Sequence, residues 1–232
     1  MTKSSPPAVE HAFTLIELLV VIATIGILLG IAVPALNSAY ERAKVAKDMS
    51  NLRQIGAATQ MYMNDNNGAF PGSATVTWMS QLELNRKYLS VWRIFESPFD
   101  KRSTSESGDA TTAVSYGINS NVYSGGVPIS ADKITKPTVF IVFAPAQASA
   151  ATVSFLGLGS SPAPGVTEVG AMSTPPGANA QGGTQNNRAK INAICADWHV
   201  ETMAWSGTGP AFTHASDPGG DPDAPYRWSP SP

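Results

Sequence analysis

Hydrophobic residues are spread unevenly along the chain, and the longest run of them lies near the N-terminus. Between Phe13 and Leu36 the only charged residue is Glu17. A helix of about 24 residues is roughly 36 Å long, whereas the hydrocarbon core of a bilayer is about 30 Å thick. This run therefore predicts a membrane-spanning helix. A carboxylate within such a helix costs about 2.5–3.5 kcal/mol on insertion scales, which indicates that Glu17 has a specific partner.

The pattern stays helical beyond this run but becomes amphipathic. Between residues 37 and 64, apolar side chains recur at spacings of three and four, as they do on one face of a helix. They are Val45, Met49, Leu52, Ile55 with Gly56, Thr59, and Tyr62 with Met63. The sequence Asp65-Asn66-Asn67-Gly68, followed by Pro71, is typical of a helix end. One helix over residues 13–64 is thus predicted, and its second half should pack on a domain.

Shorter apolar segments follow and predict one more helix and an extended piece. Residues 78–85, extended at most to 89, form the helix candidate because Trp78 and Leu82 would lie on one face. Residues 91–95 are expected to be extended and to end at Ser97-Pro98.

Strands are predicted later in the chain. Residues 139–144 form an uninterrupted apolar run that indicates a buried strand, and residues 153–158 indicate another.

The amino-acid composition of the second half of the chain predicts a long loop and a disordered tail besides the strands. Charged residues make up 14% of the sequence, against about a quarter in typical domains. Residues 146–187 are low in charge and rich in Gly, Ser, Ala and Pro, which predicts a long loop. Residues 206–232 are expected to be a mostly disordered tail. The net charge of -2 gives no sign of nucleic-acid binding, and the single Cys195 excludes an intramolecular disulfide.

A secretory signal peptide is one alternative interpretation of the N-terminal run. Such a peptide has a basic segment, a short uncharged apolar run and a small-residue cleavage site after that run. Here the run is longer and contains Glu17, and Lys3 is balanced by Glu10. Residues 30–32, Gly-Ile-Ala, match a cleavage site weakly. The signal-peptide interpretation is therefore disfavoured.

The junction Ala12-Phe13-Thr14-Leu15-Ile16-Glu17 closely resembles the processing site of type IV prepilins and type II secretion pseudopilins. In that family a membrane peptidase cuts before the Phe and methylates the new amino terminus. The resemblance implies cleavage between Ala12 and Phe13 and N-methylation of Phe13. Glu17, Gly26 and Pro34 would then be the fifth, fourteenth and twenty-second residues of the mature chain. Ala12 stands where the family usually has Gly.

The resemblance also implies roles in assembly. The Glu17 carboxylate would pair with the Phe13 ammonium of a neighbouring subunit, because a buried charge is tolerated when it is paired. Gly26 and Pro34 would bound a segment that loses helix when subunits assemble. Gly26 and Gly30 form a GxxxG pair that lets membrane helices approach closely, although small residues are also common in such helices without this role.

The orientation across the membrane follows from the processing site. Arg42, Lys44 and Lys47 slightly outnumber the nearby Glu41 and Asp48, so the positive-inside rule weakly places the C-terminal part in the cytoplasm. The prepilin-like site must face a cytoplasmic peptidase, which implies the opposite. The expected protein is single-pass in the bacterial inner membrane, with its C-terminal domain periplasmic or displayed in an extracellular filament.

The C-terminal half resembles large prepilin-like families with long C-terminal domains. Residues 115–121 and 134–144 match stretches of these families, and Ala-Asp-Trp-His-Val at residues 196–200 is similar to their closing Ala-Asp-Gly-His-Val hairpin. The resemblance implies a hairpin over residues 191–203, with strands around Ala193 and Glu201. Trp198 replaces the Gly. Because Trp disfavours the positive φ that Gly accepts, the type of turn is left open.

Asp197, His199 and His214 are the residues that invite an enzymatic interpretation. An Asp and a His two apart on a strand share a face, as acid–base partners sometimes do. No nucleophile elbow, HExxH motif or Cys pair accompanies them. An Asp in a turn that accepts a hydrogen bond from its own backbone is the ordinary explanation for Asp197. The chain is therefore expected not to be an enzyme.

No metal or cofactor is expected from the residue spacing. His11, His199 and His214 lack the spacing of metal ligands. Asp217, Asp221 and Asp223 are weak candidates for a calcium site, because hard cations take carboxylate oxygens. Their spacing matches no calcium-holding loop, and a solvated tail is favoured.

The sequence thus predicts a pilin-like α+β protein, in which a long N-terminal transmembrane helix packs on a small antiparallel β-sheet with long loops. The expected parts are a leader (1–12), a transmembrane or filament-core helix (13–36), its amphipathic continuation (37–67), a globular domain (68–205) and the tail (206–232).

The expected function is that of a structural subunit of a type II secretion pseudopilus or a type IV pilus. The alternative is a minor tip subunit or surface-displayed binding module on the same anchor. The implied partners are a prepilin peptidase and methyltransferase, other pilin-like subunits, the inner-membrane assembly platform and the lipid bilayer. No nucleic-acid partner is evident.

Overall fold

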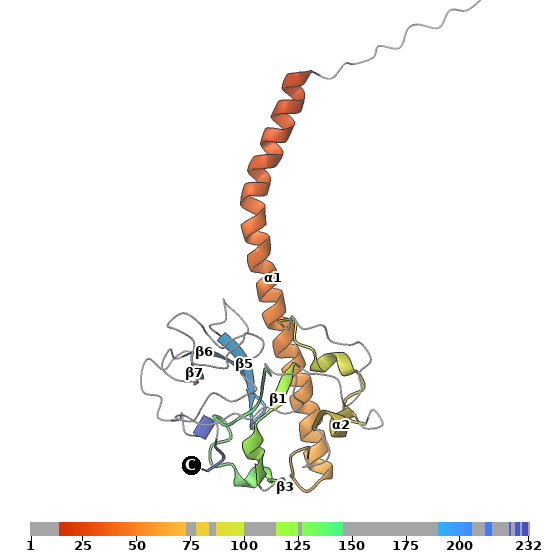
Figure 1. Ribbon diagram of the computed structural model, residues 1–232, viewed down its shortest axis with the longest axis vertical. Coiled ribbons are helices and arrows are strands. Elements are labelled where there is room, and N and C mark those ends of the chain that lie inside the picture. The colour runs from red at the N-terminus through yellow and green to blue at the C-terminus, as the bar shows by residue number, and fades with distance from the viewer. Residues whose placement is uncertain are drawn as a thin grey trace, which may run out of the picture. The chain divides into compact units, whose positions relative to one another are not determined.

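The computed structural model (Figure 1) describes residues 14–72, 78–83, 87–99, 115–124, 127–145, 190–205, 212–214, 223, 226–227 and 229–231. The chain divides into two compact units, Met1–Ala43 and Lys44–Pro232. The expected leader, the Ala12–Phe13 junction and the strand predicted at residues 153–158 lie outside the described residues.

The second unit combines helices with short strands. The elements in chain order are α1 (Leu15–Asp65), α2 (Trp78–Glu83), the 3-10 helix η2 (Trp92–Phe95), β1 (Tyr116–Ile118), η3 (Ser120–Val122), β2 (Tyr123–Ser124), β3 (Val127–Pro128), η4 (Ala131–Lys133), β4 (Ile141–Pro145), β5 (Lys190–Cys195), β6 (Val200–Trp205) and β7 (Phe212–His214).

The single long helix predicted from the hydrophobic pattern is confirmed as α1. It ends at Asp65, beside the predicted stop, where Asn67 and Gly68 adopt positive φ angles of 54° and 77°. The backbone N–H of Gly68 donates to the carbonyl of Met63 at 2.8 Å. This bond satisfies a carbonyl that would otherwise be unpaired at the helix end.

The second half of α1 buries the face that its spacing predicts. Leu52, Ile55, Gly56, Thr59 and Met63 are all buried. A stripe at this spacing faces one side of the helix, and here that side meets the core of the second unit.

The strands form a five-stranded antiparallel sheet in the order β1-β4-β5-β6-β7, and β2 and β3 pair separately. The buried strand predicted at residues 139–144 is observed as β4, and the predicted hairpin is β5–β6. In this hairpin Ala193 lies opposite Glu201 and Ile194 opposite Val200. The predicted α+β, pilin-like arrangement is confirmed.

The prediction for residues 91–95 is wrong. Trp92–Phe95 forms the 3-10 helix η2, and extended backbone occurs at Val91 and Glu96 on either side of it. The turn brings the rings of Trp92 and Phe95 to a centroid distance of 5.1 Å, and Phe95 also meets Trp78 at 5.2 Å. Burial of these aromatic side chains favours a helical turn over an extended one.

Parts of the stretch 206–232, predicted to be disordered, are ordered. Phe212–His214 forms β7, which pairs with the edge of β6. Further along, Arg227 is 4% exposed, and the backbone N–H of Thr135 donates to the carbonyl of Pro230 at 2.8 Å. Backbone pairing orders β7, and burial of the Arg227 side chain orders the residues near the C-terminus. Amino-acid composition predicts neither interaction.

A buried carboxylate joins α1 to the sheet. Asp48, which the sequence shows only as one of the charges that follow the apolar run, is fully buried. Its Oδ1 accepts hydrogen bonds from Ser97 Oγ at 2.5 Å and from the Tyr116 hydroxyl at 2.7 Å. Its Oδ2 accepts from Asn192 Nδ2 at 2.8 Å. Thr202 Oγ1 donates to Asn192 Oδ1 at 2.8 Å, so the network extends from α1 through β5 to β6.

The position of Asp48 changes its affinity for protons. Burial raises the pKa of the Asp48 carboxyl above its usual value, although the hydrogen bonds from Ser97, Tyr116 and Asn192 act in the opposite direction. A group whose pKa is higher in the folded state holds its proton more tightly there. Its contribution to stability is therefore complete below the unfolded-state pKa of about 3.9 and is lost as pH rises through the folded-state pKa.

We expect the free energy of unfolding of the parent protein, relative to that of Asp48→Asn, to fall as pH rises from about 4 to 7. The Asn variant has no group to ionise at this position. Denaturant titrations of both proteins across that pH range measure the difference, and a difference that grows with pH would contradict the expectation. Asp48→Ala leaves three donors without their acceptor and should lose roughly 2 kcal/mol or more at every pH.

Candidate functional site

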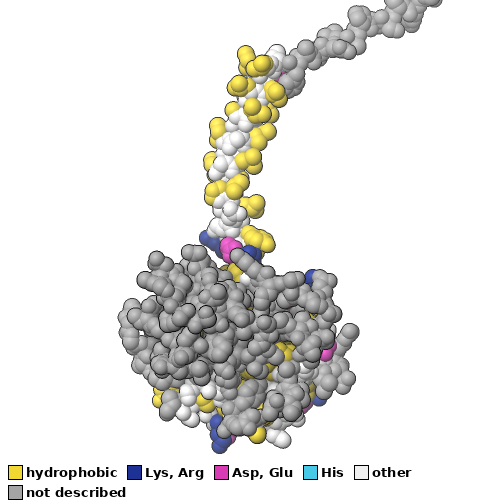
Figure 2. Space-filling model, viewed as in Figure 1, with side chains coloured by type: hydrophobic (Ala, Val, Ile, Leu, Met, Phe, Trp, Pro, Cys, Tyr) yellow, Lys and Arg dark blue, Asp and Glu magenta, His cyan; other side chains and the backbone are white. Residues whose placement is uncertain are grey.

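The first half of α1 is apolar on all sides. The large hydrophobic side chains between Leu15 and Leu36, called the apolar segment below, are 46–78% exposed in the isolated chain. Figure 2 shows them along the whole of this segment. By length and composition the helix can cross a membrane. A helix that is hydrophobic all round is stable only in an apolar environment, which lipid or other protein chains can provide.

The start of the apolar segment is fixed by Glu17. Thr14 precedes the first helical residue, and its backbone N–H and its Oγ1 both donate to Glu17 Oε2 at 2.8 Å. In return, the Glu17 N–H donates to Thr14 Oγ1 at 3.2 Å. This reciprocal arrangement is a capping box, and its Thr-x-x-Glu signature is present in the sequence. The sequence analysis considered Glu17 only as a partner for another subunit and missed this local role.

Gly26 and Pro34 lie within an unbroken helix. Pro34 is inside α1, which runs continuously through it. A Cβ built at Gly26 or Gly30 would meet nothing within 4 Å in the isolated chain. Loss of helix between Gly26 and Pro34 on assembly, and close approach of another helix at the two glycines, therefore stay predictions.

The turn between β5 and β6 brings Asp197 and His199 together. Asp197 Oδ1 accepts a hydrogen bond from the backbone N–H of His199 at 3.2 Å and lies 2.5 Å from His199 Nδ1. The prediction that Asp197 binds its own backbone in a turn is confirmed. The pair shares a face, but within the described residues no Ser, Cys or Lys nucleophile is hydrogen-bonded to His199 as a catalytic arrangement would require.

Trp198 adopts the left-handed conformation that glycine usually occupies in such a turn. Its φ is 71°, and its N–H donates to the Cys195 carbonyl at 2.9 Å. Its indole packs against the core. A Cβ added to Gly56 on α1 would collide with Ile194 Cδ1 and lie 3.3 Å from Trp198 Cε3. The absence of a side chain at Gly56 thus makes room for Ile194 and Trp198.

Of the tail residues proposed for calcium, the structure describes Asp223 alone. Asp223 Oδ1 forms an ion pair with Lys136 Nζ at 2.6 Å, and the same ammonium lies 4.2 Å from the centroid of the Tyr226 ring. Asp217 and Asp221 lie outside the described residues. The Asp223 carboxylate therefore has a cationic side chain as its partner.

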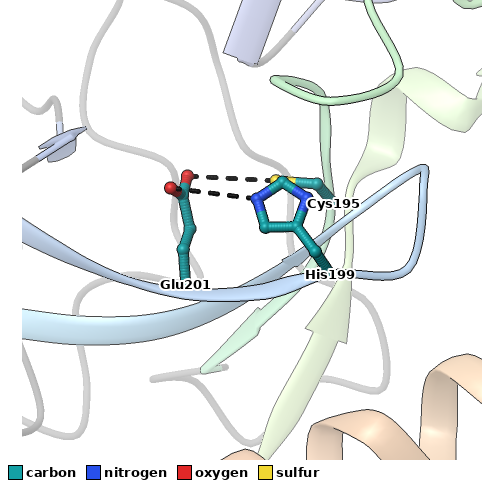
Figure 3. A group of neighbouring side chains, drawn as sticks. All are labelled: Cys195, His199 and Glu201. Carbon is teal, nitrogen blue, oxygen red and sulfur yellow. Dashed lines mark hydrogen bonds and ion pairs between the residues drawn. The ribbon is translucent and has the colours of Figure 1, made fainter.

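One cluster escaped the sequence analysis. Cys195, His199 and Glu201 place a sulfur, a ring nitrogen and a carboxylate oxygen within 4.8 Å of one another (Figure 3). Burial and the nearby carboxylates of Glu201 and Asp197 raise the pKa of the Cys195 thiol. The spacing Cys-x-x-x-His-x-Glu predicts a cluster only if the chain is known to form a hairpin between Cys195 and Glu201.

Two curated proteins are similar to part of the chain. Type II secretion system core protein G of Pseudomonas aeruginosa is 40% identical over 57 residues, which are 25% of this chain and 40% of that protein. A fimbrial protein of Neisseria meningitidis serogroup B is 37% identical over 82 residues, which are 34% of this chain and 47% of that protein. The chain is pilin-like. It spans less than half the length of either of these curated relatives.

The similarity to these two proteins supports the pilin-like resemblance that residues 12–17 indicated. No family model matches this pilin-like chain, and no solved structure gives a significant match. The long apolar helix and the antiparallel sheet agree with the similarity to a secretion-system protein and to a fimbrial protein.

We expect Trp198→Gly to be more stable than Trp198→Ala by about 1 kcal/mol, the reverse of the usual order for these two residues. Both variants lose the packing of the indole, but only alanine keeps the strain of a positive φ. Denaturant unfolding of the two variants and the parent measures this. If Trp198→Ala is the more stable variant, the left-handed conformation at residue 198 is not retained.

Proposed function

We propose that this pilin-like chain is a structural subunit of a type II secretion pseudopilus or a type IV pilus. The observation that carries the proposal is the apolar segment, which is exposed on all sides, whereas the second unit has a complete core of its own. A secretion-system protein and a fimbrial protein among the relatives support it.

The apolar segment serves in two environments under this proposal. Before assembly it spans the bacterial inner membrane as a single-pass anchor, with the second unit on the periplasmic side. In a filament the apolar segments of neighbouring subunits replace the lipid around one another. The transfer is possible because lipid tails and apolar side chains are solvents of similar polarity for Leu, Ile and Val. The assembly platform of the inner membrane would move the subunit between the two.

Processing prepares the N-terminus for this change. A prepilin peptidase would cut between Ala12 and Phe13 and the amino group of Phe13 would be methylated, as the resemblance of residues 12–17 implies. The new ammonium lies one residue before Thr14, where α1 is capped. A positive charge at this place would oppose the helix dipole unless a carboxylate balances it.

Glu17 is placed to provide that carboxylate. Its Oε2 accepts both hydrogen bonds from Thr14, which fixes the side chain toward the N-terminus of the helix. Within the described residues, no hydrogen-bond donor reaches the other oxygen, Oε1. A carboxylate has about four lone-pair sites, so Glu17 can cap its own helix and still bind the Phe13 ammonium of a neighbouring subunit.

A second candidate function is that of a minor tip subunit or a surface-displayed binding module. The observation in its favour is the low-charge stretch at 146–187, rich in Gly, Ser and Ala, which is a large addition for a densely packed major subunit. The abundance of the chain in sheared filaments separates the two functions. A major subunit dominates such a preparation, and a tip module is scarce in it.

We expect the mature protein to begin with N-methylated Phe13. Mass spectrometry of the N-terminal peptide from membrane-extracted protein measures both the cut and the added methyl group. An Ala12→Arg variant, which puts a large charged side chain at the junction, should accumulate uncut. A mature terminus near Val33 would instead establish a secretory signal peptide and exclude the proposed function.

We expect Glu17→Leu and Glu17→Gln to be inserted and processed but strongly depleted from filaments. Leu removes both the cap and the charge, whereas Gln keeps a capping-box acceptor and removes only the charge. Fractionation into membrane and sheared filaments, with crosslinking between subunits, measures the distribution. Glu41→Gln is the matched control, since it removes a carboxylate from the same helix beyond the apolar segment.

The two variants distinguish the roles of Glu17. If Glu17→Gln assembles as well as the parent while Glu17→Leu does not, the cap matters and the charge pair is wrong. If both assemble normally, Glu17 has no part in assembly.

A further inference from the structure

The cluster of Cys195, His199 and Glu201 lies at the turn of the β5–β6 hairpin (Figure 3). Cys195 is the last residue of β5 and Glu201 the second of β6. Because Ala193 lies opposite Glu201, Cys195 is the diagonal neighbour of Glu201 on the same face of the sheet. His199, in the connecting turn, reaches over the same face.

The distances suit a small divalent ion. Cys195 Sγ lies 3.9 Å from Glu201 Oε1, and His199 Nε2 lies 3.9 Å from Glu201 Oε2. Ligand atoms around tetrahedral zinc are roughly 3.4–3.6 Å apart, given Zn–S of about 2.3 Å and Zn–N and Zn–O of about 2.0–2.2 Å. The three ligand atoms lie within 4.8 Å of one another, so side-chain rotations that bring them about 1 Å closer would reach these separations.

The ring of His199 is already oriented as a metal ligand. Its Nδ1 lies 2.5 Å from Asp197 Oδ1, which leaves Nε2 directed toward Glu201. Histidines that bind metals almost always donate their second ring N–H to a carboxylate or carbonyl in this way. Asp197 thus positions His199 and is not itself one of the three ligands.

The charges around the cluster also match a divalent cation. Arg227, 4% exposed, approaches Glu201 Oε1 at 3.3 Å and leaves Oε2 on the side of His199. With Cys195 as a thiolate, the three negative groups of Cys195, Asp197 and Glu201 are balanced by Arg227 and one divalent ion.

We propose that Cys195, His199 and Glu201 bind one Zn²⁺ ion, with Asp197 holding His199 in place and a water molecule as the fourth ligand. The His199 side chain is 41% exposed, so the ion and the water can reach the site from solvent. A set of thiolate, imidazole and carboxylate favours zinc over the hard cations Mg²⁺ and Ca²⁺. On binding, Cys195 releases its thiol proton to solvent. The ion links the end of β5 to the start of β6 across the turn that contains Trp198.

The test is metal binding by the full chain in detergent after treatment with a chelator. Co²⁺, used as a spectroscopic probe, should bind one to one and give a thiolate-to-cobalt charge-transfer band that Zn²⁺ abolishes. Zn²⁺ should also raise the thermal unfolding midpoint. His199→Ala and Glu201→Gln should each weaken binding at least tenfold, and Asp197→Asn 10–100-fold. Asp132→Asn, which removes a carboxylate on η4, is the control and should bind like the parent.

Cys195 is the single cysteine of the chain, so its alkylation reports on the site even if Cys195→Ser fails to fold. Zn²⁺ should slow the reaction of the parent thiol with a maleimide, and should have a much smaller effect in folded His199→Ala. The proposal is overturned if no charge-transfer band forms, or if His199→Ala and Glu201→Gln bind the metal as tightly as the parent.

Discussion

The buried carboxylate of Asp48 is the interaction on which the second unit depends. Three side chains from separate parts of the chain donate to it: Ser97 after η2, Tyr116 in β1 and Asn192 in β5. An apolar contact would allow α1 to slide or rotate against the sheet at little cost. A carboxylate with three fixed donors does not, because a displaced donor would be left buried without an acceptor. The network therefore determines which residues of α1 meet which strands.

The two halves of α1 differ in whether their hydrophobic side chains are buried within the chain. The part from Lys44 onward satisfies its hydrophobic face within its own chain. The apolar segment has no such face, since its side chains are exposed all around. Under the proposed function its stability comes from lipid or from other copies, so attachment to the membrane and assembly would be properties of the same residues. This dependence on an outside partner is what a subunit requires and what an independent domain avoids.

The sequence predicts the parts of this structure that depend on periodicity. The length of α1, its end at Asp65 and the buried strand β4 follow from the spacing of apolar residues and turn signals. The β5–β6 hairpin follows from the resemblance of residues 196–200 to a hairpin of large prepilin-like families. The polar features were missed because they depend on contacts between distant residues. Asp48 has the sequence surroundings of an exposed charge, and Cys195, His199 and Glu201 converge only through strand register. The Thr14–Glu17 cap was missed as well, although its Thr-x-x-Glu motif is local and can be recognised in the sequence.

Gly56 and Trp198 show a different kind of dependence between distant positions. Gly56 on α1 has no side chain, and the Trp198 indole on the hairpin turn packs close to this position. Neither position can change alone without leaving a void or a collision. Glycine at position 198 alone would not free the space over the helix, because a Cβ at position 56 would still collide with Ile194 Cδ1. Positions 56, 194 and 198 are therefore expected to covary between lineages, and a chain that acquired only one of the changes would pass through a less stable intermediate.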